Sequence, residues 1–222
     1  EGTYSDARHP DEVRFSDSLS EDLMRRDFTI NALAFDPGRG ELIDEHGGLS
    51  DIENRLIRTI GRAEERFFED GLRPVRACRF CAALEFEIED LTRRALADPA
   101  VQERTRKVAV ERFTDEIFKA FQSRYVSRMI RPLEESGLLR IFLTLPECPT
   151  PPSALQELDR LYPAHPQIRI ALWWHRCGAH KVGELRNAAK RLKLSNAAAR
   201  DISHAAAYLD LLTKTWLPAP PW

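Results

Sequence analysis

The chain has 222 residues, of which 43% are hydrophobic and 31% are charged, so it can bury a core and still present a polar surface. This composition excludes an intrinsically disordered chain and a collagen-like or mucin-like fibre, and no run of eighteen apolar residues predicts a membrane span. Because 33 Lys and Arg oppose 35 Asp and Glu, the formal net charge is only -2, and a polyanionic partner would have to bind a local basic cluster.

The cysteines and the N-terminus bear on where the protein acts. Cys78, Cys81, Cys148 and Cys177 are too few and too scattered for a disulfide scaffold, so we expect a cytoplasmic protein in a reducing compartment. The first ten residues, EGTYSDARHP, contain neither an initiating Met nor the apolar stretch of a signal peptide. We therefore expect that the chain does not begin where its gene begins.

The first 61 residues alternate short apolar runs with turn signals, as segments of mixed α and β structure do. Six elements are expected there: a strand at 13–16, a helix capped by Ser20, two strands of a hairpin at 32–35 and 41–44, a helix with a capping box at 50–53, and a strand at 56–60. The hairpin prediction depends on the Pro and two Gly of the segment DPGRG between the two apolar strands.

From Gly61 onwards the strand signal disappears and apolar residues recur at helical spacing. Helices are expected over 67–84, 108–121, 126–139, 154–161, 168–176, 183–194 and 197–212. The proline-dense segment 145–152 is the best candidate boundary, and 217–222 is expected to be a frayed or linking tail. The predicted fold class is therefore α+β and mostly α, with a partial α/β segment followed by an all-helical array.

The segment RRDFTIN at 25–31 places two guanidiniums, a carboxylate and an amide at a predicted helix-to-strand junction. Arginine forks suit phosphate, whereas Asp27 and Asn31 could bond ribose hydroxyls or order a neighbouring loop. For an isolated RRD the ordinary interpretation is a surface arginine beside an Asp cap, so this segment alone indicates little.

The segment EDGLRPVRACR at 69–79 spaces three arginines, Arg73, Arg76 and Arg79, so that on a helix they form one slowly spiralling row. Asp70 precedes Arg73 by one turn and could bond the same guanidinium. Three neighbouring arginines repel one another unless an anion lies among them, so we favour ligand binding over a solvated face with one ion pair. The proline at position 74 predicts that the helix begins near it or bends there.

Two further patterns have ordinary structural interpretations. Cys78 and Cys81 form a CxxC pattern, but no second CxxC occurs, so we expect packed thiols on an apolar helix and no Cys/His metal site. Gly47 and Gly48 separate a predicted strand from a predicted helix and form either a tight connection or a hinge.

Three basic residues near the C-terminus, Arg186, Lys190 and Lys193, are predicted to share one helix face. Basic residues at this spacing are most often a solvated face. Contact with an RNA backbone is the alternative interpretation.

Taken in order, these segments resemble the bacterial (class II) tRNA nucleotidyltransferase and poly(A) polymerase family. The resemblance rests on five motifs: YSDARHPD at 4–11, RRDFTINA at 25–32, IDEHGGLSDI at 43–52, EDGLR at 69–73, and ER followed by DEI at 111–117. It extends over 1–145, with a looser helical likeness beyond, and RRDFTIN together with EDGLR is its most specific part.

The resemblance implies a nucleotide-binding role for seven residues. In this family the motif RRDxxxN contacts the incoming triphosphate and ribose, and the motif EDxxR bonds the base edge of CTP or ATP as a protein template. The implied residues are Arg26, Asp27 and Asn31 for triphosphate and ribose, Asp70 and Arg73 for the base, and Arg76 and Arg79 for the triphosphate. The chain departs from the family pattern at His46, Gly71 and Pro74, which concerns the local backbone more than the chemistry.

The resemblance implies Mg²⁺ ligands upstream of the YSDARHPD motif, in a Gly-Ser or Gly-Gly motif followed by an Asp-x-Asp strand, and no such motif followed by Asp-x-Asp occurs downstream in this chain. The resemblance therefore implies that the Mg²⁺ ligands lie outside residues 1–222 and that this chain holds no catalytic or metal-binding residue. We expect no transfer by this polypeptide alone, with the missing head segment supplied elsewhere in the protein or by another chain.

The resemblance also implies three domains: the C-terminal part of a nucleotidyltransferase head with a mixed sheet at 1–61, a helical nucleotide-selecting neck at 62–145, and a helical tRNA-contacting body at 146–222. The implied function is template-independent addition of CMP and AMP to the 3′ end of tRNA, from CTP and ATP, by a CCA-adding or A-adding enzyme. Two alternatives stay open, a poly(A) polymerase of the same family and a non-catalytic RNA- or nucleotide-binding helical module.

Overall fold

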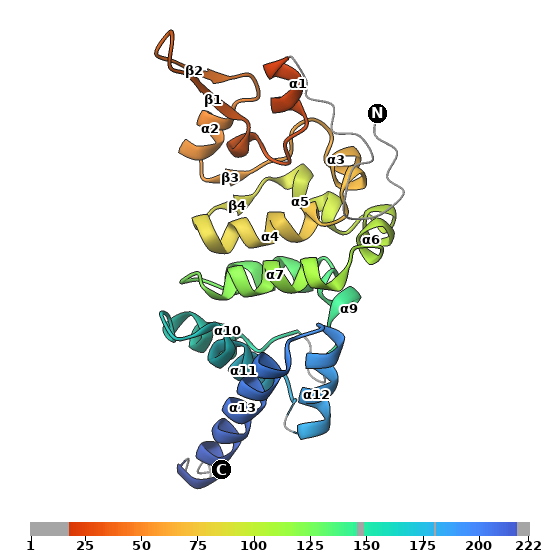
Figure 1. The fold of residues 1–222 in the computed structure, drawn as a ribbon, viewed down its shortest axis with the longest axis vertical. Helices are drawn as coiled ribbons and strands as arrows, with labels where there is room; N and C mark the ends of the chain where they lie inside the picture. The colour runs from red at the N-terminus through yellow and green to blue at the C-terminus, as the bar shows by residue number, and fades with distance from the viewer. Residues whose placement is uncertain (1–17, 146–148, 180, 217–222) are drawn as a thin grey trace. The chain divides into compact units, whose positions relative to one another are not determined.

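A computed structural model describes residues 18–145, 149–179 and 181–216 (Figure 1). The described residues form two compact units. Of the described residues, the first unit contains those up to Ala77 together with Phe86–Ala109, and the second contains Cys78–Glu85 together with those from Val110 onwards. The predicted strand at 13–16, Cys148 and the tail at 217–222 lie outside the described residues, and the three predicted domains stay a prediction.

The first unit begins with short elements of both kinds. In chain order these are α1 (Leu19–Met24), the 3-10 helix η1 (Thr29–Asn31), β1 (Leu33–Asp36), β2 (Glu41–Asp44), α2 (Gly48–Glu53) and β3 (Leu56–Ile57). The predicted cap of α1 is wrong by two residues, because Ser18 has the extended backbone of an N-cap and its side chain accepts from the Glu21 N–H. Ser20 lies inside the helix, where its hydroxyl donates to Glu45 at 2.6 Å.

The predicted hairpin is confirmed. Strands β1 and β2 pair antiparallel, with Leu33 opposite Asp44 and Phe35 opposite Leu42. The connecting turn is closed by the Asp36 carboxylate, which accepts from two backbone N–H groups of the segment that follows.

Helix α2 begins at Gly48 and is capped from upstream, so the predicted capping box at 50–53 is wrong. Gly47 has a φ of 75°, and the carboxylate of Asp44 accepts from the N–H groups of Gly48 at 2.7 Å and Leu49 at 2.9 Å. Burial alone would raise the pKa of Asp44, but the donors of Leu49, Gly48, His46 and Gly47 together lower it. An aspartate in the preceding strand therefore replaces the predicted cap.

The rest of the first unit is mostly helical. It contains α3 (Ala63–Glu69), the start of α4 (Arg73–Leu84), β4 (Glu87–Ile88), α5 (Asp90–Leu96) and α6 (Pro99–Arg106). Helix α4 begins one residue before Pro74, as predicted, because proline needs no N–H partner in a first turn. Strand β4 was not predicted; it pairs parallel with β3, which is shorter than the strand expected at 56–60.

A small apolar core holds the hairpin side of this unit together. Leu23 of α1, Ala32 and Ile60 are buried in one cluster, and Ala34 and Ile43 of the hairpin pack against it. The confirmed class is α+β and mostly helical, and the described strands form one antiparallel pair and one parallel pair rather than a single sheet.

The second unit is helical throughout its described part. After the end of α4 it contains α7 (Val110–Phe121), α8 (Ser127–Glu135), α9 (Leu139–Phe142), α10 (Pro152–Arg160), α11 (Pro166–Arg176), α12 (Val182–Arg191) and α13 (Asn196–Trp216). These confirm the helices expected from 108 onwards, with the stretch at 126–139 divided into α8 and the start of α9. Helices α11 and α13 pack along each other (Figure 1). Within the described ranges, no helix is both long and apolar enough to cross a membrane.

A buried arginine joins three helices of the second unit. The guanidinium of Arg169, in α11, donates to the carbonyls of Phe121, Ser123 and Arg124 at the end of α7 and to that of Leu158 in α10. Burial lowers its pKa, against the raising effect of nearby acidic groups. These four bonds satisfy carbonyls at a helix end that would otherwise be buried without donors.

Candidate functional site

The RRDFTIN segment crosses from α1 to η1 and places an aspartate and an asparagine in contact. Asp27 is 8% exposed, and its Oδ1 accepts from the Asn31 side-chain amide at 2.9 Å and from the Phe28 N–H at 3.0 Å. Because Asn31 is the last residue of η1, the tight turn of that helix brings its side chain back to Asp27. The two polar side chains predicted to contact ribose therefore form one unit.

The second oxygen of Asp27 is bonded by the arginine row. Oδ2 lies 2.8 Å from Nε and 2.7 Å from Nη2 of Arg76, in α4. The pair is only partly open to solvent, because the Arg76 side chain is 31% exposed. Two segments that the sequence singled out separately are thus joined by one ion pair.

Arg73 is held by three partners that the sequence analysis did not identify. Its Nη1 donates to the carboxylate of Glu69 and to the carbonyl of Arg66 at 3.0 Å, and its Nη2 donates to the carbonyl of Arg25 at 3.0 Å. Within the described part of the chain, these bonds use three of the five guanidinium N–H groups and leave Nε–H and one Nη2–H as donors.

The carboxylate of Asp70 does not accept from the guanidinium of Arg73 in the described structure, contrary to the prediction. Its Oδ1 accepts from the N–H of Leu72 at 3.0 Å, and its carbonyl accepts from the N–H of Arg73. Glu69 takes its place: it is the last residue of α3 and lies four residues before Arg73, the first residue of α4, with Asp70 in an extended conformation between the two helices. That spacing was the signal available in the sequence.

Arg79, the third arginine of the row, pairs with Glu116 of α7. Glu116 is 2% exposed and also receives Lys119 Nζ at 2.9 Å, while the Arg79 guanidinium lies 3.9 Å from the centroid of the Phe80 ring. Each arginine of the row therefore has its own carboxylate. These carboxylates relieve the repulsion between the arginines, so that repulsion no longer requires a bound anion, and ligand binding at the row stays a prediction.

Arg26 lies apart from these contacts. It pairs with Asp22 of α1 at 2.8 Å, and both side chains are about half exposed. The hydrogen bond and the charge of Arg26 lower the pKa of Asp22. An exposed pair of this kind contributes little to stability, so Arg26 can exchange its partner readily.

The cysteine pair and the double glycine were both given structural interpretations from the sequence. Cys78 and Cys81 are both buried, which confirms packed thiols. A Cβ on Gly48 would lie 2.4 Å from the carbonyl oxygen of Thr29, so the double glycine forms a tight connection, and its role as a hinge stays untested.

The predicted basic face is only partly formed. Arg186 and Lys190 are exposed on α12. Lys193 lies beyond the end of that helix at Arg191, with a φ of 48°, and its Nζ pairs with Glu111 at 2.7 Å. The prediction that Lys193 shares a helix face with the other two is therefore wrong, because the helix ends before it. An RNA-binding role for the three residues stays a prediction.

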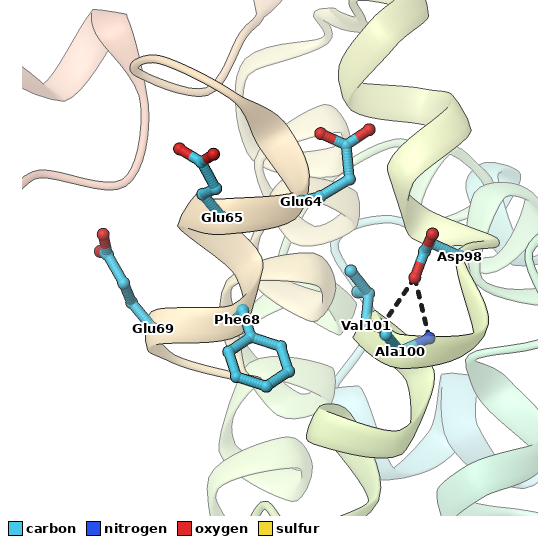
Figure 2. A pocket seen from close by; sticks show the side chains of 7 residues that line it. All are labelled: Glu64, Glu65, Phe68, Glu69, Asp98, Ala100 and Val101. Atoms are coloured by element: carbon cyan, nitrogen blue, oxygen red, sulfur yellow. Dashed lines mark hydrogen bonds between the residues drawn. The ribbon is translucent and has the colours of Figure 1, made fainter.

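The first unit also contains a pocket of about 440 Å³ between α3 and α6 that the sequence analysis did not find (Figure 2). Its lining residues are Glu64, Glu65, Phe68, Glu69, Asp98, Ala100 and Val101. Figure 2 shows acidic side chains on α3 and at the N-terminus of α6, where Asp98 caps the helix. Four carboxylates make this pocket unsuitable for a polyphosphate, so the nucleotide site is not assigned to it.

Two stretches of the chain match known families. Residues 1–58 match the Poly A polymerase head domain. Residues 85–149 match the probable RNA and SrmB-binding site of polymerase A.

Curated proteins and solved structures give the same result. The chain is 40% identical over 202 residues to a CCA-adding enzyme of Anoxybacillus flavithermus, which covers 91% of this chain and 49% of that protein. It matches the crystal structure of the Bacillus stearothermophilus CCA-adding enzyme in complex with CTP with a TM-score of 0.74 and 35% identity, over 93% of this chain and 49% of that one. The Thermotoga maritima CCA-adding enzyme complexed with tRNA gives a TM-score of 0.64 at 26% identity, over 88% of this chain and 51% of that one. The chain thus spans about half the length of these relatives.

Proposed function

Because this chain belongs to the tRNA nucleotidyltransferase and poly(A) polymerase family, we propose that it is the nucleotide-selecting part of a CCA-adding enzyme. Such an enzyme adds CMP and AMP to the 3′ end of tRNA, with CTP and ATP as substrates. The observation that carries the proposal is the pairing of Asp27 with Arg76 next to an Arg73 that retains two donors. The solved relatives that contain CTP or tRNA support it.

Base selection is proposed for Arg73 and Asp70. Cytosine and adenine both present an amino group beside a ring nitrogen that accepts, whereas guanine and uracil present a carbonyl beside an N–H. A guanidinium donor and a carboxylate acceptor complement the first pattern and oppose the second. The side chain of Arg73 is 15% exposed, so its bonds to a base would form with little competition from water.

Triphosphate binding is proposed for Arg26, Arg76 and Arg79, with ribose contacts from Asp27 and Asn31. Arg26 is best suited to it, because its exposed pair with an aspartate of α1 exchanges at little cost. Arg76 and Arg79 would have to share their guanidiniums between a phosphate and the carboxylates that already bind them. Their share of the triphosphate contact is therefore expected to be smaller.

The family implies Mg²⁺, but the described residues do not fit it. In residues 18–145, 149–179 and 181–216 there is no grouping of three or more His, Cys, Asp or Glu side chains that could hold a metal ion. We therefore assign no catalytic step to a metal held by this chain, and propose that the Mg²⁺ ligands belong to a further head segment.

The exposed apolar face of the hairpin is evidence for the proposed further head segment. Phe35 and Leu42 lie directly opposite each other on β1 and β2, and they are 63% and 49% exposed. A two-stranded hairpin with an apolar outer face is marginally stable in water unless more structure covers it. The head segment that supplies the metal ligands is the proposed cover.

The remaining partners follow from the same proposal. Exposed Arg186 and Lys190 are proposed to contact the tRNA backbone, with Lys193 contributing if it leaves Glu111. We propose a cytoplasmic location, in keeping with a tRNA-processing role. The alternatives are a poly(A) polymerase, which would bind ATP in preference to CTP, and a non-catalytic RNA- or nucleotide-binding module.

The test is nucleotide binding by this chain, measured by isothermal titration with CTP, ATP, GTP and UTP. We expect CTP and ATP to bind more tightly than GTP and UTP, and Arg73→Ala to weaken CTP and ATP by about tenfold, the effect of one lost charge-assisted bond. Arg93→Ala removes an arginine of α5 that contacts Glu87 and serves as the matched control. If Arg73→Ala lost affinity equally for all four nucleotides, the proposed template role of Arg73 would be wrong. Binding of ATP alone by the parent chain would favour the poly(A) polymerase.

A further inference from the structure

Helix α2 packs unusually closely on the turn that carries Asp27 and Asn31. The carbonyl oxygen of Thr29, the first residue of η1, lies where a side chain at Gly48 would begin. One turn further along α2, Asp51 is 5% exposed, and its Oδ2 accepts from the Thr29 hydroxyl at 2.6 Å. The short bond joins two buried groups that are 22 residues apart in the chain.

The turn is held from a second side by its backbone. The N–H of Thr29 donates to the carbonyl of Arg58 at 3.0 Å, and Thr29 itself is 2% exposed. The side chain of Arg58 returns to Asp51, with Nε at 3.1 Å from both carboxylate oxygens, and its Nη1 lies 3.5 Å from Glu89. The buried charge of Asp51 is therefore paired, as a carboxylate in such a place requires.

These contacts are made to Thr29 of η1, and η1 connects them to the proposed nucleotide site. Asp27 and Asn31 flank Thr29 on either side, and their mutual hydrogen bond depends on the tight turn between them. A shift of η1 would move Asn31 away from Asp27 and change the carboxylate that Arg76 binds. A contact to ribose or phosphate tolerates displacements of only about 0.5 Å.

We propose that Asp51 is a positioning residue for the nucleotide site, acting through Thr29 on the Asp27–Asn31 pair. This inference rests on the proposed function, since it concerns the same site. In the described part of the chain Asp51 bonds the side chains of Thr29 and Arg58, and its contribution to the site is to fix the turn before a nucleotide arrives. Such preorganisation raises affinity because less order has to be imposed on binding.

The decisive variant is Thr29→Val, which removes the hydroxyl and keeps the shape, with Thr29→Ser as the conservative rescue. We expect Thr29→Val to weaken CTP binding by about tenfold, the effect of one buried hydrogen bond, and Thr29→Ser to restore most of it. The matched control is Thr92→Val in α5. Thr92 is fully buried in the same unit and bonds Glu89 and the Thr59 N–H, but it makes no contact with η1 in the described structure.

The readout separates positioning from simple loss of stability. Denaturant unfolding is measured for both valine variants, and the side-chain amide signal of Asn31 is followed by NMR in each. We expect that signal to shift in Thr29→Val and to stay in place in Thr92→Val. Equal losses of CTP affinity in the two variants, or an unmoved Asn31 signal in Thr29→Val, would overturn the inference. If Thr29→Val does not fold, Thr29→Ala removes the same hydroxyl and gives the comparison instead.

Failure of the inference can be told apart from failure of the proposed function. Asp27→Asn and Asn31→Ala test the site itself, and unchanged CTP affinity in both would remove the proposed site. If they weaken CTP and Thr29→Val does not, only the role of Asp51 is wrong. A double variant of Thr29→Val with Asn31→Ala should bind CTP no more weakly than Asn31→Ala alone, because the hydroxyl acts through that amide. Additive losses would contradict the inference.

Discussion

Arg76 places two N–H groups on a single carboxylate oxygen of Asp27, 49 residues earlier in the chain. The other oxygen of Asp27 accepts the Asn31 amide, so one carboxylate joins the RRDFTIN segment to the arginine row of α4. This pair is the internal contact on which the proposed nucleotide site depends.

Replacing Asp27 by Asn should lower the free energy of unfolding by about 1–3 kcal/mol, because the variant loses a charge-assisted bond in a partly buried place. The loss stays below that of a fully buried pair, since the Arg76 side chain is 31% exposed. Urea unfolding followed by circular dichroism measures it. The control is Asp22→Asn, which breaks the exposed pair with Arg26 and should leave the midpoint unchanged. Similar shifts in both variants would mean that the Asp27 pair carries no special stability.

The sequence predicted the elements whose signals are local. The hairpin followed from its turn residues, the start of α4 followed from Pro74, and the two motifs later joined by Asp27 and Arg76 were both singled out. What it did not predict was which carboxylate each arginine binds. Glu69 lies only four residues before Arg73, but Glu116 pairs with Arg79 from α7, 37 residues further along the chain, and no local pattern records such a contact.

The same limit explains the errors at helix ends and strands. Asp44 caps α2 from the preceding strand. The capping box predicted at 50–53 therefore placed the start of this helix at the wrong residue. Strand β4 has two residues, too few for any alternation to show, and it exists because its backbone pairs with β3. In both places a contact between segments determined the local structure.

Replacing Glu116 by Gln should be more damaging than replacing Asp27. Glu116 is 2% exposed and faces both Arg79 and Lys119, so loss of its charge leaves a nearly buried guanidinium without its counterion. We expect a decrease of about 3 kcal/mol in the free energy of unfolding. Asp115→Asn alters the exposed neighbour on the same helix and should have no measurable effect in the same urea titration.

Arg169 should be the most sensitive arginine of the second unit. Its replacement by Met removes donors from four backbone carbonyls, at the end of α7 and in α10. A decrease of about 3 kcal/mol or more is expected, because buried carbonyls without donors are costly. Arg131→Met on the exposed face of α8 is the control. A shift of the thermal midpoint no larger than that of the control would show that water replaces the lost donors.

Glu89 should make the free energy of unfolding depend on pH in the acidic range. Burial would raise its pKa, but the N–H groups of Thr92 and Leu91, the Thr92 hydroxyl and the charge of Arg58 together lower it from the ordinary 4.5. A carboxyl whose folded pKa is lowered contributes stability above its unfolded pKa, and this contribution is lost as the pH falls through the folded value. Urea midpoints from pH 7 down to pH 3, a range that spans the ordinary pKa of a glutamate, should therefore fall more steeply below 4.5 in the parent than in Glu89→Gln. Parallel curves for the two proteins would rule out this contribution, and Glu103→Gln, at an exposed position, is the control.

The last prediction concerns transfer itself. This chain, supplied with Mg²⁺, a tRNA lacking its 3′ CCA and labelled CTP and ATP, should bind nucleotide but incorporate none, because its described residues form no metal-binding group. A full-length CCA-adding enzyme in the same reaction shows that the tRNA and nucleotides are competent. Addition of a separately expressed head segment with the Asp-x-Asp motif should restore incorporation if it covers the Phe35 and Leu42 face, and Phe35→Lys should then reduce that recovery without changing CTP affinity. Robust incorporation by this chain alone would show that it holds metal ligands of its own and would refute the proposed division of labour.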